Sequence, residues 1–227
     1  MKRVDSMVPR LVSKDIFLYV FGREETKDLL MDLVNTVLED SAREPVVDIE
    51  LVGPDSDRDV YKMQETVIDA LATARDGSKF DLEVMVSIQP ASIKRYLHAW
   101  SELYMVRSRK NWAYGRFKPA VSINLLDFVM FPESVKSHCR MEIANERNPE
   151  IILSDDFQLH FVELTKALPG ESRLSDWITV LENTGKEGFN MNHEVFRSGD
   201  VFTRAYTLYR QCVDDESLPA RPRIREP

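Results

Sequence analysis

The clearest pattern in the chain is a pair of alternating apolar and polar runs within residues 66–89. Arg75-Asp76-Gly77-Ser78 joins the two runs, and an Asp-Gly pair in that position is a strong β-hairpin signal because glycine adopts the positive φ that such turns need. Strand side chains alternate between faces. The second run therefore places one set of side chains opposite another: Phe80, Leu82, Val84, Val86 and Ile88 against Asp81, Glu83, Met85 and Ser87.

The length of the turn decides which residues of this hairpin pair. With a three-residue loop at residues 75–77, Asp69 lies directly opposite Glu83. With the loop one residue later, Asp69 pairs with Met85 and lies diagonal to Glu83, and a strict two-residue turn would place it opposite Val84. The sequence leaves these registers open. In the first two, the carboxylates are about 4.5–8 Å apart on one face, a separation that suits a bound cation such as Mg²⁺.

Hydrophobic periodicity predicts further elements on both sides of the hairpin. Helical spacing of apolar residues indicates helices over residues 13–22, 24–39, 92–111, 175–184 and 195–213. Strands are predicted over residues 46–52, 120–131, 138–144 and 158–164. Together these elements predict an α/β fold with a mixed central β-sheet flanked by helices.

Composition narrows the class of protein. The 227 residues are 43 % hydrophobic and 30 % charged, as in ordinary soluble globular proteins. The chain shows no apolar run long enough to cross a membrane, no secretory signal and no nucleotide-binding glycine motif, so we expect a cytoplasmic protein with no membrane association and no nucleotide cofactor. Cys139 and Cys212 fit no disulfide or metal pattern. The net charge of −8 argues against a general nucleic-acid coat but allows a local basic groove.

Five segments accompany the hairpin motif of Asp69, Gly77 and Leu82-Glu83-Val84-Met85. They are Asp15-Ile16-Phe17 with Phe21-Gly22, Leu29-Leu30 with Asn35 and Leu38, Arg95, Lys118-Pro119-Ala120-Val121 with Leu125-Leu126-Asp127-Phe128, and Glu163-Leu164-Thr165-Lys166. Their order and spacing over about residues 11–170 resemble the PD-(D/E)XK nucleases, in particular the recombination-promoting nuclease and putative transposase branch. The resemblance implies a restriction-endonuclease-like core over residues 11–168. A helical C-terminal appendage over residues 169–215 and a disordered basic tail over residues 216–227 are predicted to follow.

The resemblance also implies an activity and its site. It points to a metal-dependent DNA endonuclease that hydrolyses phosphodiester bonds, with Asp69 and Glu83 as catalytic metal ligands and the backbone carbonyl of Val84 as a further ligand. The implied cofactor is Mg²⁺, with Mn²⁺ as the alternative. Glu50 either joins this acidic site from the strand at residues 46–52 or faces solvent.

DNA is the implied partner, and a homodimer is one possible assembly. Lys62, Lys94 and Arg95 are the candidate nucleic-acid-binding residues, because Lys62 precedes the Asp69 strand and the other two lie near the start of the helix predicted over residues 92–111.

Two positions depart from the family pattern. Met85 occupies the third catalytic position, where the branch has Gln and the superfamily Lys, and Leu18 stands where a Lys is expected. A thioether is a weak hydrogen-bond acceptor and a poor ligand for a hard cation. Two hypotheses follow: an endonuclease impaired by Met85, in which Lys62 or Lys94 substitutes for the missing group, or a catalytically inactive nucleic-acid-binding or protein-interaction module on a decayed nuclease fold.

Overall fold

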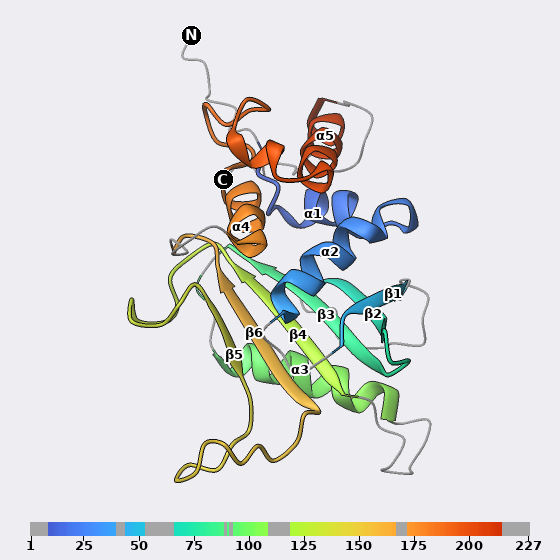
Figure 1. Ribbon diagram of the computed structural model, residues 1–227, viewed down its shortest axis with the longest axis vertical. Coiled ribbons are helices and arrows are strands. Elements are labelled where there is room, and N and C mark those ends of the chain that lie inside the picture. Colours follow the sequence, from blue (N-terminus) through green and yellow to red (C-terminus); the bar gives the residue numbers. More distant parts are fainter. Residues whose placement is uncertain are drawn as a thin grey trace, which may run out of the picture.

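A computed structural model describes residues 9–39, 44–52, 66–88, 90, 93–108, 119–166 and 172–214. In this part of the chain a six-stranded mixed sheet has the order β1-β2-β3-β4-β6-β5 and carries helices on both faces (Figure 1). The strands are β1 (Val46–Leu51), β2 (Thr66–Ala74), β3 (Lys79–Ser87), β4 (Ala120–Leu126), β5 (His138–Met141) and β6 (Phe157–Glu163). Strands β1, β2 and β3 are antiparallel neighbours, β3, β4 and β6 are parallel, and β5 lies antiparallel to β6 at the far edge. The predicted α/β class with a mixed sheet is confirmed.

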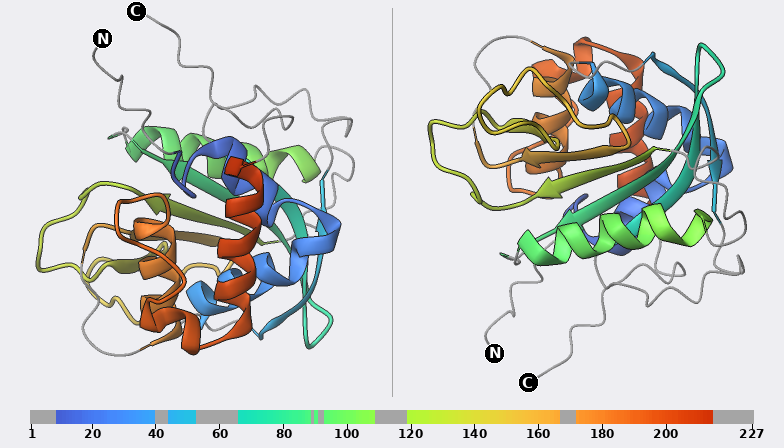
Figure 2. Two further views of the ribbon diagram at one scale, coloured as in Figure 1. Left: turned by 90° about the horizontal axis from the view of Figure 1, so that it is seen from above. Right: turned by 90° about the horizontal axis from the view of Figure 1, so that it is seen from below.

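The helices form two layers on either side of this sheet. One layer contains α1 (Lys14–Phe21), η1 (Glu24–Thr26), α2 (Lys27–Leu38), α4 (Arg173–Asn183), η3 (Glu194–Arg197) and α5 (Asp200–Asp214). The other contains α3 (Ile93–Ser108), which crosses the opposite face alone among the described helices (Figure 2). Within the described ranges, each helix is too short or too polar to span a lipid bilayer.

Each face of the sheet packs its own hydrophobic cluster. The alternate apolar positions of the hairpin, including Ile68, Leu82 and Val84, lie in the large cluster under α1, α2, α4 and α5. Residues of the remaining parity, including Met85 and Phe161, lie in a smaller cluster under α3. The alternating pattern of the sequence therefore reflects a sheet that is buried on both faces, and not a sheet with one solvent-exposed face.

The C-terminal helices share the large cluster with the N-terminal ones. Trp177 of α4 and Phe202 of α5 are fully buried, and the Trp177 ring packs edge-on against Phe21 of α1 with centroids 5.6 Å apart. Whether residues 169–215 form an appendage separate from a core over residues 11–168 stays a prediction, although α4 and α5 complete the hydrophobic core of this layer. Residues 216–227 lie outside the described part of the chain.

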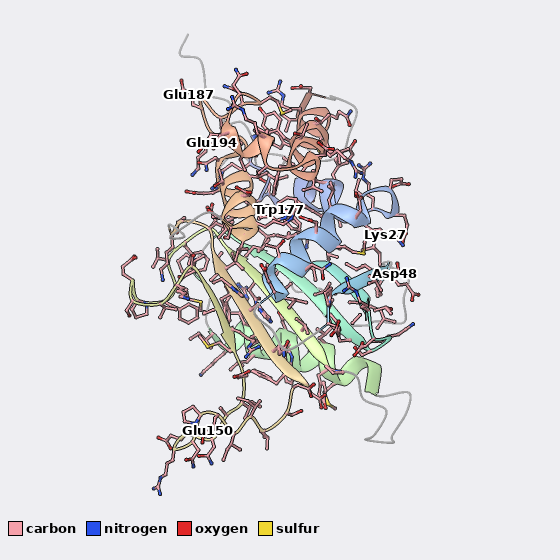
Figure 3. All side chains as sticks on the ribbon, viewed as in Figure 1. Lys27, Asp48, Glu150, Trp177, Glu187 and Glu194 are labelled. Atoms are coloured by element: carbon pink, nitrogen blue, oxygen red, sulfur yellow. The ribbon has the colours of Figure 1, made fainter. Side chains whose placement is uncertain are left out.

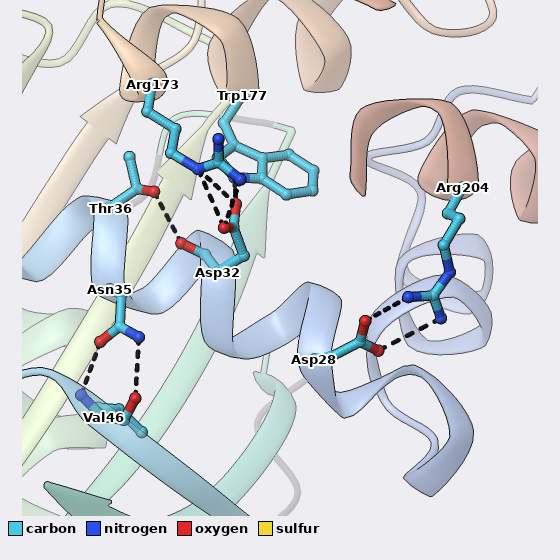
Figure 4. A network of polar contacts seen from close by, with 8 residues as sticks. All are labelled: Asp28, Asp32, Asn35, Thr36, Val46, Arg173, Trp177 and Arg204. Atoms are coloured by element: carbon cyan, nitrogen blue, oxygen red, sulfur yellow. Dashed lines mark hydrogen bonds and ion pairs between the residues drawn. The ribbon is translucent and has the colours of Figure 1, made fainter. Parts of the chain in front are cut away.

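Two acidic residues of α2 hold these C-terminal helices in place (Figure 4). The Asp32 carboxylate accepts hydrogen bonds from the Arg173 guanidinium at 2.6–3.1 Å and from the Trp177 indole nitrogen at 2.7 Å. Asp28, one turn earlier, pairs with Arg204 of α5. Hydrogen bonds to an ionised carboxylate are stronger than those between neutral groups. We therefore expect these contacts from α2 to stabilise the packing of both α4 and α5.

The two edges of the sheet are marked by an exposed ion pair at β1 and by a projecting connection between β5 and β6. At β1, Lys27 of α2 donates to Asp48 at 3.1 Å (Figure 3). At the other edge, the connection between β5 and β6 projects away from the sheet, with Glu150 near its tip (Figure 3).

Three predicted elements have bounds that differ from their apolar pattern, and one of them, the strand predicted over residues 138–144, ends at Met141. The strand predicted over residues 120–131 stops at Leu126, because residues 127–137 turn into a loop whose backbone is held by buried side chains at the end of β6. The helix predicted over residues 195–213 is interrupted: Ser198 donates to the Val195 carbonyl to close a 3₁₀ turn, and α5 starts afresh at Asp200.

Candidate active site on the β2–β3 hairpin

The register of the hairpin brings the two acids together. Asp69 of β2 lies directly opposite Glu83 of β3, and opposed residues of antiparallel strands have Cα atoms about 4.5–5.5 Å apart. The turn has the three-residue form: Gly77 has a φ of 83° and donates to the Ala74 carbonyl at 2.9 Å. This register is one of the three that the sequence allowed, and the other two are wrong.

Neighbouring strands extend the pair into a row, which we call the acid row: Asp69, Glu83 and Ser122. The parallel pairing of β3 with β4 places Ser122 beside Glu83. Asp69 and Glu83 occupy the positions between the apolar residues of the large cluster, so the acid row belongs to the α3 face of the sheet. The structure describes the backbone of both acids, and their place on the sheet follows from it.

A bulge in β2 adjoins the acid row. The pairing shifts between Thr66 and Ile68, opposite Met85 and Val84 of β3. Bulges leave an extra residue unpaired, bend the strand and are common beside active sites because they redirect nearby groups. The irregular part of the ladder includes Val84, whose backbone carbonyl the family resemblance implies as a metal ligand.

Met85 is fully buried in an apolar cluster. It is 0 % exposed and packs with Tyr96 of α3 and Phe161 of β6. Its apolar surroundings and its weak acceptor sulfur mean that Met85 supplies no strong polar group to the acid row.

Asn124 is a polar group that the sequence did not single out. It lies beside Met85 in the β3–β4 pairing and is 0 % exposed. Its Nδ2 donates to Ser122 Oγ at 3.3 Å and to the His160 carbonyl at 3.1 Å, while its Oδ1 has no hydrogen-bond partner among the described residues. The available signal was the alternation of Ser122 and Asn124 within the apolar run of β4.

The other predicted site residues fall in several places. Lys94 and Arg95 are exposed on the first turn of α3, which covers the same face of the sheet as the acid row. Lys62 lies outside the described residues. Glu50 is exposed on β1 opposite Leu71, two positions along β2 from Asp69. An exposed carboxylate at this place is compatible with both alternatives, namely that Glu50 joins the acidic site or that it faces solvent.

Leu18, the other departure from the family pattern, lies on α1 and is 41 % exposed. Helix α1 belongs to the layer across the sheet from the acid row. The absence of Lys at position 18 therefore removes no charge from the face that carries Asp69 and Glu83.

The late E-L-x-K motif forms a buried ion pair rather than part of the acid row. Glu163 and Lys166 are almost fully buried, with Lys166 Nζ 2.6 Å from Glu163 Oε2. Glu163 Oε1 accepts from the backbone nitrogens of Met130 and Phe131, and Lys166 Nζ donates to the carbonyls of Phe131, Pro132 and Val135. The pair holds the loop at residues 127–137, which explains the early end of β4.

Asp127, which belongs to the Leu125-Leu126-Asp127-Phe128 motif, makes a separate structural contact. It pairs with Arg10, whose Nη2 donates to the Glu182 carbonyl at 2.8 Å. The N-terminal segment is thereby tied both to the end of β4 and to α4.

Metal-binding side chains are sparse elsewhere. In the part of the chain that the structure describes, no three His, Cys, Asp or Glu residues are grouped so as to hold a metal ion. Two acids with a backbone carbonyl fall short of that count. The donor set at the acid row consists of oxygen atoms, which are the ligands that Mg²⁺ and Mn²⁺ prefer.

A mixed six-stranded sheet with helices on both faces is consistent with a restriction-endonuclease-like core. The chain belongs to the PD-(D/E)XK nuclease family transposases, whose family model matches residues 15–221. The match extends beyond the motifs at residues 11–170 and includes α4 and α5, in keeping with their place in the shared core. No curated protein and no solved structure matches the chain.

Proposed function

We propose that the protein is a metal-dependent endonuclease that hydrolyses phosphodiester bonds of DNA. The observation that carries the proposal is the direct pairing of Asp69 with Glu83 beside a bulge in β2. Two carboxylates at this separation repel each other, and a cation between them removes the repulsion. The hairpin is a rigid place for such a pair because both strands are hydrogen-bonded on either side and packed on the large cluster.

The residues at the acid row fit a divalent cation. Asp69 and Glu83 would hold it, with the carbonyl of Val84 as a further oxygen ligand at the irregular ladder. When bound, such an ion lowers the pKa of a coordinated water and neutralises charge on the scissile phosphate. Lys94 and Arg95 would contact the DNA backbone from the first turn of α3, and Lys62 is a further candidate for such contacts.

A specific observation favours a second candidate function. Met85 is fully buried in an apolar cluster, at the position where the family pattern has a polar third group. A chain of this kind could bind nucleic acid or protein without turnover, and the two candidates differ in whether a DNA strand is cut.

The test is cleavage of supercoiled plasmid in Mg²⁺, in Mn²⁺ and in EDTA. The wild-type chain should nick or linearise the plasmid only with metal, and Asp69→Asn and Glu83→Gln should each abolish cleavage. Asp48→Asn is the matched control, because Asp48 is a strand acid paired with Lys27 at the edge of the sheet, and it should cleave as wild type does.

Two results would contradict the proposal. Cleavage that survives both acid substitutions would place the activity outside the acid row. A wild-type chain that binds plasmid in a gel-shift assay but never cuts it would favour the binding module.

A further inference from the structure

The side chain of Asn124 contains a buried hydrogen-bond acceptor that the described part of the fold does not use. The orientation of its amide is settled by chemistry: the His160 carbonyl can only accept, so the atom 3.1 Å from it must be the nitrogen. The oxygen is therefore the atom that lacks a partner among the described residues. Buried polar groups are almost always hydrogen-bonded, and an exception calls for an explanation such as strain, a catalytic role, or a bound water or ion.

Asn124 lies on the same face of the sheet as the acid row, two positions along β4 from Ser122. Nδ2 contacts Ser122 Oγ at 3.3 Å, so the Asn124 side chain leans back along β4 towards the residue that adjoins Glu83. Nitrogen and oxygen diverge from one trigonal carbon. The nitrogen is held by Ser122 Oγ and by the His160 carbonyl of β6, so the oxygen diverges from both contacts; the residue of β3 that lies beside Asn124 is Met85.

We propose that Asn124 is a positioning residue whose Oδ1 accepts a hydrogen bond from the water that attacks the scissile phosphate. It would supply from β4 the amide that Met85 does not supply from β3. This inference rests on the proposed endonuclease function and names a residue within its site. A purely structural role, pinning β4 to β6, explains the nitrogen of Asn124 but not its oxygen.

The step is a hydrolysis and needs no reagent beyond water. The water oxygen forms a new bond to phosphorus, one phosphorus–oxygen ester bond breaks, and the leaving oxygen takes up one water proton while the other stays on the product phosphate. An amide oxygen is too weak a base to remove that proton. Asn124 therefore orients the water and does not act as a general base.

The test uses four full-length chains: wild type, Asn124→Leu, Met85→Gln and the double variant. Thr184→Val serves as a matched control, because Thr184 is also fully buried, with an oxygen that lacks a described partner, but lies at the end of α4. Single-turnover plasmid cleavage and the DNA concentration at half-maximal rate are measured with Mg²⁺. The unfolding midpoint is measured without metal for every chain.

We expect Asn124→Leu to cleave at least tenfold more slowly at saturating DNA, with an unchanged half-maximal DNA concentration. Met85→Gln should restore cleavage in the double variant, since it returns an amide to the adjacent strand. The metal-free unfolding midpoints should also show that positions 85 and 124 interact. Met85→Gln should lower the midpoint less in the chain that keeps Asn124, because Asn124 Oδ1 accepts a hydrogen bond from the new amide. It should lower the midpoint more in the chain that carries Asn124→Leu. Thr184→Val should cleave as wild type does.

Wild-type rates in Asn124→Leu, or a folded double variant that Met85→Gln does not rescue, would overturn the role of Asn124 while leaving the endonuclease intact. A wild-type chain that never cleaves overturns the proposed function, and the role of Asn124 with it. If Asn124→Leu does not fold, Asn124→Thr is tested instead and judged by the same outcomes. Threonine has no amide, and its side chain is too short to place its hydroxyl where the amide oxygen of Asn124 lies.

Discussion

Asp69 lies directly opposite Glu83 across the β2–β3 ladder, with the bulge in β2 beginning just before Asp69. Like charges directly opposite in a sheet destabilise it. Two ionised carboxylates at these positions would lower the stability of the hairpin, and a cation bound between them would offset that loss. The relationship makes metal binding and stability measurable together.

Metal should stabilise the folded protein through these two acids. At a hundredfold excess of Mg²⁺ or Mn²⁺ over the dissociation constant, an ion that binds only the folded chain adds about 2.7 kcal/mol. Asp69→Ala should abolish this gain and should raise the metal-free midpoint, because it removes one of two repelling charges. Thermal unfolding with and without metal provides the measurement. Asp48→Ala should retain the gain, and an Asp69→Ala chain that retains it would place the metal elsewhere.

Gly77 should resist replacement by residues with a Cβ. Its φ of 83° lies in the left-handed region, and no atom of the described residues comes within 4 Å of the point where a Cβ would lie, so the cost of substitution comes from the backbone alone. Gly77→Ala should lower the free energy of unfolding by about 1–2 kcal/mol. Gly77→Asn should cost less, because asparagine tolerates this conformation. Equal losses for both variants in urea denaturation would show that conformation is not the cause.

The ion pair of Glu163 with Lys166 should dominate the stability of the loop at residues 127–137. Lys166→Met leaves a carboxylate buried without its cation, and such a change costs about 3–5 kcal/mol. Lys186→Met removes an exposed pair with Glu182 at 2.9 Å and should cost less than about 1 kcal/mol. Denaturant unfolding compares the two. Similar losses would mean that the buried pair contributes no more than a surface one.

Cys139 should be an unreactive thiol at neutral pH. Burial raises its pKa from 9.0 to about 11, and the nearby Glu163 carboxylate acts in the same direction while Lys166 opposes the shift. Since the folded chain holds this proton more tightly, the associated stability is present below about pH 9 and is lost as pH rises from about 9 to about 11.

The measurement for Cys139 is alkylation by iodoacetamide, followed by peptide mass spectrometry that resolves it from Cys212. The native rate should rise only near pH 11, whereas the chain in denaturant should react near the ordinary thiol pKa of 9.0. A native rate that follows the denatured one would contradict the burial of the thiol.

Local patterns predicted a large part of the fold. The parity of Leu82 and Val84 against Glu83 predicted the hairpin and its two faces. Helical spacing predicted α1, α2, α3 and α4 to within a few residues, whereas the helix predicted from residue 195 is interrupted and α5 begins at Asp200. Boundaries failed where long-range contacts decide them: β4 stops at Leu126 because residues 127–137 are held by Glu163 and Lys166, which come much later in the chain.

For the candidate site, the sequence singled out the two acids, Asp69 and Glu83, but not Asn124, whose positioning role is our proposal. Asp69 stands out in an apolar run, so charge alone marks it. Asn124 looks like any polar residue in a buried strand, and its importance depends on two facts that no local pattern contains: which residue pairs with Met85, and which atom of the amide lacks a described partner.

By itself the sequence determined the identity of the acids, the alternation that places them on one face and the glycine that permits their turn, because these depend on residue type and short spacing. Only the tertiary structure decided the register among three allowed pairings, the strand order that sets β4 beside β3, and the sharing of one core by α1, α2, α4 and α5. Those features arise from contacts between residues far apart in the chain, whose energies depend on how whole faces pack and not on any local run of residues.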